Sequence, residues 1–322
     1  MKKNRTSVPE SPGGLSRRKF LGGAAAAAAV LAANPLGATG FFGSPSGSGP
    51  GGGFKLKYAP PFGMFAEHAG KNPVDQLKFM ADQGFRAFFD NGLMNRPAAD
   101  QEAISGEARR LGLDAGPFVA YADFGKTSFV TRDPEIREML VGRIRTAVET
   151  SKRTGVKQTL VVPGRIDERL EWDYQTANVV ENLRFLADIC ESEGLVMVIE
   201  PLNPKDHPGL FLTKIPQAFQ ICRAVSSPAC KIVNDLYHQQ ITEGDLIRNI
   251  DRAWDEIAAF HVGDNPGRRE PGTGEINYRN IFKHLHAKGT DPVICMEHGK
   301  SLPGKDGETA VIAAYRACDD FA

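Results

Sequence analysis

The chain has 322 residues, with 39 basic and 39 acidic side chains, so its formal net charge is zero. This balance argues against a nucleic-acid-binding protein, which normally carries a basic excess. The length permits two small domains or one large α/β barrel, and either can bury a sizeable core. The five cysteines form no C-x-x-C pair, so buried free thiols are favoured, with a Cys222–Cys230 bridge left open.

The first 53 residues have a composition of their own. They hold six basic residues, one acidic residue and 12 of the 34 glycines, which leaves residues 54–322 mildly acidic. A basic start is followed by Ser16-Arg17-Arg18-Lys19-Phe20-Leu21 and then by an apolar run that ends near residue 33. Charged, apolar and small residues in this order are typical of an export signal. The apolar run is too short to span a bilayer, so no stable membrane span is expected.

The S-R-R-x-F-L segment resembles a twin-arginine signal, and the weakly hydrophobic run after it suits that export route. We therefore expect a twin-arginine signal peptide over residues 1–39 and a periplasmic or other extracytoplasmic location. Residues 40–53 are rich in Gly, Ser and Pro and predict a flexible linker.

From residue 54 onward, short apolar runs alternate with longer amphipathic ones. Capping residues precede a proline at Asn72 and Asp133, which predicts two helix starts. The predicted strands are 54–59, 85–89, 113–120, 158–162, 195–200, 231–235, 257–262 and 292–297. The predicted helices between and after them are 73–83, 100–111, 134–154, 173–192, 214–225, 242–253, 278–287 and 308–318.

Eight such strand–helix units predict an α/β fold, a (β/α)8 TIM barrel that covers residues 54–322. An open, doubly wound sheet is the alternative. That alternative lacks support because no G-x-G-x-x-G motif follows a predicted strand.

Four consecutive predicted strands end in side chains that can bind a metal. They end, in order, at Glu200, Asp235, His261 and Glu297. Neighbouring strands lie about 4.8 Å apart, so inward-pointing side chains at equivalent heights converge. Three carboxylates in one dry site repel each other unless a cation lies between them. The sequence therefore predicts one divalent metal ion, Mn²⁺ or Mg²⁺, with Co²⁺ as a third option.

Three further features lie near the same end of the predicted barrel. The Gly- and Pro-rich loop at 263–275 carries Arg268 and Arg269, which either bring positive charge to the site or belong to a solvated surface loop. His207 follows the fifth strand and is better explained as a surface residue than as a substrate contact. His298 directly follows Glu297 and is a candidate for orienting the ligands.

Three segments resemble the hydroxypyruvate isomerase family. They are Ile199-Glu200-Pro201-Leu202-Asn203, then Asp235-Leu236-Tyr237-His238, and the 266–278 segment PGRREPGTGEINY. That family belongs to the xylose isomerase-like barrels and has the ketose 3-epimerases as relatives. The resemblance spans roughly residues 54–322 and is most specific between Glu200 and Glu297.

The resemblance implies a role for each of six residues. Glu200, Asp235, His261 and Glu297 would hold the metal, and the two glutamates would exchange a proton with the substrate. His238 would contact the substrate, and Arg268 would help to stabilise its oxyanion. Hydroxypyruvate isomerases typically carry Gln at the position of His261, where ketose epimerases carry His. The second strand ends in Phe89-Asp90-Asn91, where family members often show Glu.

The sequence thus predicts an isomerase that acts on a small hydroxy-ketone or ketose through an enediolate. Its expected partner is a small sugar or hydroxy-keto acid rather than nucleic acid, and a homo-oligomer stays open. A ketose 3-epimerase or an inosose dehydratase-like lyase on the same metal site are the alternatives. More distant ones are a phosphodiesterase of the endonuclease IV type, which needs more histidine ligands, and a sugar-binding protein without activity.

Overall fold

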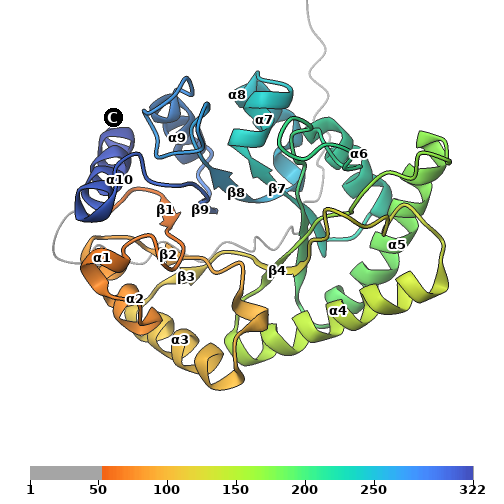
Figure 1. Ribbon diagram of the computed structural model, residues 1–322, viewed down its shortest axis with the longest axis horizontal. Coiled ribbons are helices and arrows are strands. Elements are labelled where there is room, and N and C mark those ends of the chain that lie inside the picture. Colours follow the sequence, from red (N-terminus) through yellow and green to blue (C-terminus); the bar gives the residue numbers. More distant parts are fainter. Residues whose placement is uncertain (1–52, 322) are drawn as a thin grey trace, which may run out of the picture. The chain divides into compact units, whose positions relative to one another are not determined.

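The computed structural model describes residues 53–321, which fall within one compact unit. Parallel strands occupy its centre and helices surround them (Figure 1). The predicted signal peptide over 1–39 and all but the last residue of the predicted linker over 40–53 lie outside the described residues.

The strands follow the chain around a barrel made of two parallel sheets. Seven of them pair in the order β1-β9-β8-β7-β6-β5-β4, so the first strand lies beside the last, and β2 pairs with β3. The backbone N–H of Phe89 donates to the Pro60 carbonyl at 3.2 Å and joins β2 to β1. The bounds are β1 (Lys57–Ala59), β2 (Ala87–Phe88), β3 (Asp114–Ala115), β4 (Phe118–Tyr121), β5 (Gln158–Val161), β6 (Val196–Ile199), β7 (Cys230–Asp235), β8 (Ile257–Val262) and β9 (Val293–Met296). The predicted (β/α)8 barrel is confirmed.

The third strand of the barrel is interrupted, although the sequence predicted it as one piece over 113–120. Gly116 and Pro117 separate β3 from β4. A Cβ at Gly116 would lie 2.6 Å from Cys295 Sγ and 2.8 Å from Phe89 Cβ, so no other residue fits there without a shift. Pro117 has no N–H to donate to a neighbouring strand. Cys295, at 0% exposure, packs inside the barrel against this position.

The helices that cover the barrel have the caps expected from the sequence. The Asn72 side chain accepts from Val74 N, and Asp133 accepts from Glu135 N. The bounds are α1 (Ala66–Ala69), α2 (Pro73–Asp82), α3 (Ala98–Leu111), α4 (Pro134–Thr154), α5 (Trp172–Ser192), α6 (Ile215–Val225), α7 (Leu236–Thr242), α8 (Leu246–Ala253), α9 (Tyr278–Ala287) and α10 (Gly304–Asp319), with short 3₁₀ turns at Leu93–Asn95 and Trp254–Glu256.

The structure corrects one helix. The sequence predicted a helix over 242–253, but the chain forms α7 before this range and starts α8 only at Leu246. Gly244 and Asp245 both have positive φ, 64° and 49°, which ends one helix and sets the direction of the next. This correction matters for the site because α7 follows directly on β7 and carries His238.

The core has two layers. A large cluster packs the helices against the outside of the sheet, and two smaller ones lie inside the barrel. All five cysteines are free thiols, and four of them are buried. None of the helices within the described residues is both long enough and apolar enough to cross a membrane.

Candidate active site and metal centre

The four predicted metal ligands come together at the carboxyl-terminal end of the barrel. One ligand atom from each of Glu200, Asp235, His261 and Glu297 lies within 4.8 Å of all the others. Strand register explains part of this, because Asp235 pairs directly with His261 and His261 with Cys295, two residues before Glu297. Successive inward positions on a strand are two residues apart, so Cys295 and Glu297 share the inner face.

The distances within this cluster suit a divalent cation. His261 Nδ1 lies 3.2 Å from Glu200 Oε1 and 3.0 Å from Glu297 Oε2. An ion bound at about 2.1 Å separates opposite ligand atoms by roughly 4.2 Å, close to the spacing in the cluster. Three carboxylates and one imidazole are donors that Mg²⁺ or Mn²⁺ accepts. The residues present therefore fit the predicted metal.

The charged groups in the cluster shift one another's pKa values. Burial raises the pKa of Glu200 to about 7. Burial also acts on Glu297, but His261 and Arg268 outweigh it and hold the pKa of that carboxyl below its usual range. Burial would lower the pKa of His261, yet the Glu297 and Glu200 carboxylates raise it well above its usual value. The concentrated negative charge thus calls for a nearby cation, as a divalent ion supplies.

Asp235 is both a predicted ligand and the N-cap of α7. Its Oδ1 accepts from the backbone N–H groups of Tyr237 at 2.8 Å and His238 at 3.2 Å. The same turn places His238 Nε2 3.6 Å from Asp235 Oδ2, in a position where the His238 side chain is 1% exposed. Burial lowers the pKa of His238. His238, predicted to contact substrate, therefore lies directly beside the ligand Asp235.

The loop after β8 delivers Arg268 to the site. Arg268 Nη2 donates to Asp235 Oδ2 at 2.9 Å and to Glu297 Oε2 at 2.6 Å, and its Nε donates to the Glu297 carbonyl at 3.0 Å. Its guanidinium carbon lies 4.9 Å from the centre of the Tyr237 ring. Arg269 instead donates to the Lys300 carbonyl. Of the two arginines considered in the sequence, only Arg268 contacts the cluster.

Asp264 holds this loop in shape, and its role was not recognised in the sequence. The carboxylate is 0% exposed and accepts from four backbone N–H groups, those of Asn265, Gly272, Gly274 and Ile276, at 2.8–3.0 Å. The Arg268 backbone has a φ of 50°, and its N–H donates to the Asp264 carbonyl at 2.9 Å. The segment around Arg268 is therefore fixed by one buried carboxylate.

Replacing Asp264 by Asn will destabilise the loop at 263–275 and lower kcat. The amide NH₂ group will face two backbone N–H donors, which leaves buried donors unsatisfied at a cost of about 1–3 kcal/mol. We expect a lower melting temperature and a lower kcat, because Arg268 will lose its fixed position. Thermal unfolding and steady-state kinetics check this. Glu275→Gln, on an exposed side chain of the same loop, serves as the control. An unchanged melting temperature and kcat in the Asp264 variant would contradict this role.

Other contacts were also not predicted, since they join segments far apart in the sequence. Asn91, after β2, donates from Nδ2 to Glu297 Oε1 at 2.9 Å. The His207 ring lies 4.9 Å from Phe124 and 5.3 Å from His238, so His207 packs beside the site rather than alone on the surface. His298 contacts the Gly299 carbonyl and, from Nε2, the Tyr315 hydroxyl at 2.9 Å, and shows no contact with the ligands.

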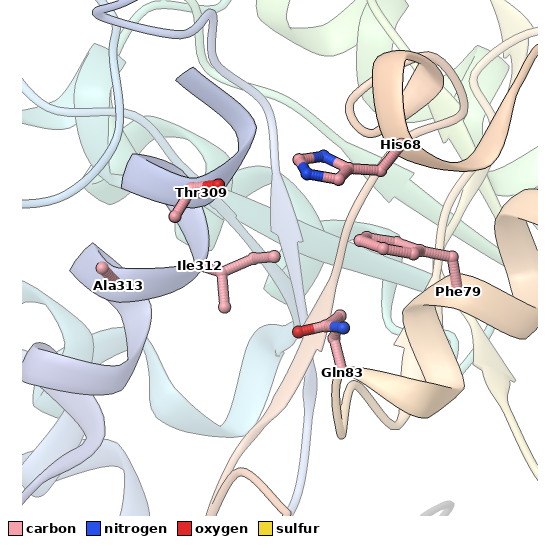
Figure 2. A pocket seen from close by; sticks show the side chains of 6 residues that line it. All are labelled: His68, Phe79, Gln83, Thr309, Ile312 and Ala313. Atoms are coloured by element: carbon pink, nitrogen blue, oxygen red, sulfur yellow. The ribbon is translucent and has the colours of Figure 1, made fainter. Parts of the chain in front are cut away.

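A separate groove lies on the outside of the barrel, between α1, α2 and α10 (Figure 2). Its volume is about 270 Å³. No residue of the metal-binding cluster lines it; the lining residues are His68, Phe79, Gln83, Thr309, Ile312 and Ala313. The chemistry of the site is therefore not placed in this groove.

Comparison with curated proteins finds isomerases. Over 171 residues the chain is 35% identical to hydroxypyruvate isomerase from Escherichia coli, a match that covers 53% of this chain and 64% of that protein. Over 238 residues it is 30% identical to 2-oxo-tetronate isomerase from Cupriavidus necator, covering 73% of this chain and 89% of that protein.

Comparison with solved structures supports the same fold. The structure of a 3-keto-D-glucoside 4-epimerase from Escherichia coli aligns with a TM-score of 0.68 at 20% identity, over 82% of this chain and 100% of the other. A family model described as xylose isomerase-like TIM barrel matches residues 77–318. The chain therefore belongs to the xylose isomerase-like TIM barrel family.

Proposed function

We propose that this chain is a divalent-metal-dependent isomerase that moves a proton between neighbouring carbons of a small hydroxy-ketone or ketose. That the chain is an isomerase follows from the matched relatives, whose names point to hydroxypyruvate and 2-oxo-tetronate as candidate substrates. The observation that carries the chemistry is the position of two glutamates. Glu200 and Glu297 approach the same ring nitrogen of His261, at 3.2 and 3.0 Å, from the ends of two different strands.

Two carboxylates around one point can remove and return a proton. In the proposed reaction, one glutamate takes the proton from the carbon that bears the substrate hydroxyl, and the C–H electrons form the C=C bond of an enediolate. The same carboxylic acid, or the other glutamate, then protonates the former carbonyl carbon. The hydroxyl oxygen becomes the new carbonyl and its proton passes to the former carbonyl oxygen, which becomes the new hydroxyl, so the reaction conserves mass. When bound, the metal polarises the substrate carbonyl.

The negative charge that develops on the substrate oxygen needs fixed partners. Arg268 brings its guanidinium to Glu297 and Asp235, at 2.6 and 2.9 Å, within the same cluster. His238 adds a buried ring nitrogen, Nε2, that has no hydrogen-bond partner among the described residues. Both groups are held in place before substrate binds, which is the condition for effective stabilisation of a developing oxyanion.

An epimerase on the same site is the second candidate. His261 favours it, because the resemblance assigns Gln to this position in hydroxypyruvate isomerases and His in ketose epimerases. Epimerisation needs a base on each face of the reacting carbon, and Glu200 and Glu297 extend from different strands. Return of the proton to the opposite face of the same carbon inverts it.

Product identity tests the proposal. Purified protein with Mn²⁺ is incubated separately with hydroxypyruvate, a 2-oxo-tetronate and a panel of ketoses, and each product is identified. A product of equal mass whose carbonyl has moved to the neighbouring carbon supports the proposed reaction. A product of equal mass with the carbonyl in place and one stereocentre inverted supports the epimerase. A product lighter by one water assigns the chain to the dehydratase-like lyases. Binding of these compounds without any conversion contradicts an enzymatic role.

We also propose that the chain is exported by the twin-arginine route before it acts. The support is the S-R-R-x-F-L segment and the apolar run after it. Replacing Arg17 and Arg18 by Lys should retain the full-length protein in the cytoplasm. Cell fractionation checks this, and an unchanged distribution between the fractions would contradict it.

A further inference from the structure

We infer that Asn203 is a positioning residue that fixes His238 as the neutral tautomer with its proton on Nε2. Asn203 lies four residues after the end of β6 and is 0% exposed. Its side-chain amide lies beside Nδ1 of the His238 ring. The position of the proton on His238 follows from contacts in the loop after β6. The role of this proton in the reaction rests on the function proposed above.

The orientation of the Asn203 amide is set by its own loop. Its Oδ1 accepts from the backbone N–H of Lys205 at 3.1 Å and of Asp206 at 2.9 Å. Its Nδ2 donates to Asp206 Oδ2 at 2.9 Å. A flipped amide would point its NH₂ group at two N–H donors and its oxygen at a carboxylate, so this orientation is the one that satisfies every group.

This orientation determines where the proton lies on His238. Asn203 Nδ2 is 2.7 Å from His238 Nδ1, and the Asn203 backbone N–H also donates to Nδ1, at 3.3 Å. Two donors face this nitrogen, so it must present its lone pair as an acceptor. A neutral imidazole with an accepting Nδ1 carries its proton on Nε2.

The Nε2–H group is therefore free to donate into the site. His238 Nε2 is buried and has no hydrogen-bond partner among the described residues. The nearest acceptor recorded for it, Asp235 Oδ2, is 3.6 Å away, beyond hydrogen-bond distance. His238 can then donate to a substrate oxygen as it gains charge, but it has no lone pair toward the substrate with which to act as a base.

Nitrogen-15 NMR of the full chain loaded with Mg²⁺ tests the tautomer directly. The chain has seven histidines, and the His238→Gln variant identifies the signals of His238 by their loss. We expect the shift of a protonated nitrogen at Nε2 and of an unprotonated one at Nδ1. A protonated Nδ1 in the wild-type protein would overturn the inference, whether or not the protein turns over a substrate.

Two variants test the role of Asn203. N203D keeps an oxygen for the two loop N–H groups but places an acceptor at His238 Nδ1, which draws the proton to that nitrogen. We expect the Nδ1 signal to become that of a protonated nitrogen and kcat to fall about 10- to 100-fold, with KM changed much less. K205A, which removes an exposed side chain in the same loop, should change neither.

These measurements distinguish failure of the role inferred for Asn203 from failure of the proposed function. If N203D retains both the wild-type NMR spectrum and the wild-type kcat, Asn203 does not set the tautomer and the inference is wrong. If the wild-type spectrum is as expected but no compound in the substrate panel is converted, the tautomer stands and the proposed function fails.

Discussion

Replacing either Glu200 or Glu297 by Gln will lower kcat by about 10²- to 10⁴-fold, the usual contribution of a positioned general acid or base. Glutamine keeps the shape of the side chain but cannot accept the proton. The fold should survive because neither residue lies in the packed core clusters. In metal-free Glu200→Gln protein the melting temperature should not fall, since the variant removes a buried carboxylate whose pKa burial has raised.

Steady-state kinetics on a verified substrate, with circular dichroism as the folding check, measures this effect. Glu102→Gln, on the exposed face of α3, is the matched control and should retain full activity. Glu297→Gln should be the less stable of the two active-site variants, because Glu297 receives hydrogen bonds from Asn91 and Arg268. Near-wild-type kcat in either variant would contradict the assignment of the two glutamates as proton carriers.

Removing divalent metal with a chelator will abolish turnover, and one equivalent of Mn²⁺ or Mg²⁺ per chain will restore it. The reason is the one such cluster within residues 53–321, formed by Glu200, Asp235, His261 and Glu297, whose ligand atoms all lie within 4.8 Å of one another. Elemental analysis and titration of the stripped protein measure the stoichiometry. Asp235→Asn should weaken metal binding strongly, because it removes one of three negative ligands.

The surface pair of Asp251 with His284, at 2.8 Å, provides the control. Asp251→Asn should leave metal content and turnover unchanged, since this carboxylate contacts His284 and Lys288 and none of the four ligands. Full turnover in metal-free protein would contradict the metal assignment. Three ions per chain would instead support the phosphodiesterase alternative.

The four ligands were predictable because strand ends are visible in the sequence. Each follows an apolar run of strand length, and parallel strands present their carboxyl ends at one edge of the sheet. The starts of α2 and α4 were equally predictable, since Asn72-Pro73 and Asp133-Pro134 each place a capping residue before a first-turn proline. Local signals of this kind do not depend on the rest of the fold.

The rest of the site depends on contacts that no local pattern records. Asn91, after β2, contacts Glu297, after β9, only because the fold brings these two strand ends close together. Arg268 reaches the cluster through a positive φ and a loop held by Asp264. Helix α7 was missed because Asp235 was interpreted as a ligand alone, although the same side chain also caps the helix.

Solvent exchange at the reacting carbon tests proton transfer by Glu200 and Glu297 most directly. The protein, loaded with Mn²⁺, converts a panel of sugars and hydroxy-keto acids in deuterated water, the metal is removed with a chelator, and NMR reads the C–H positions. We expect deuterium at the carbon that gains a proton, in wild-type protein and not in Glu297→Gln or Glu200→Gln. Product that forms over many turnovers without any deuterium would contradict proton transfer by two glutamates that exchange with water, and would leave direct hydrogen transfer or a single base shielded from water.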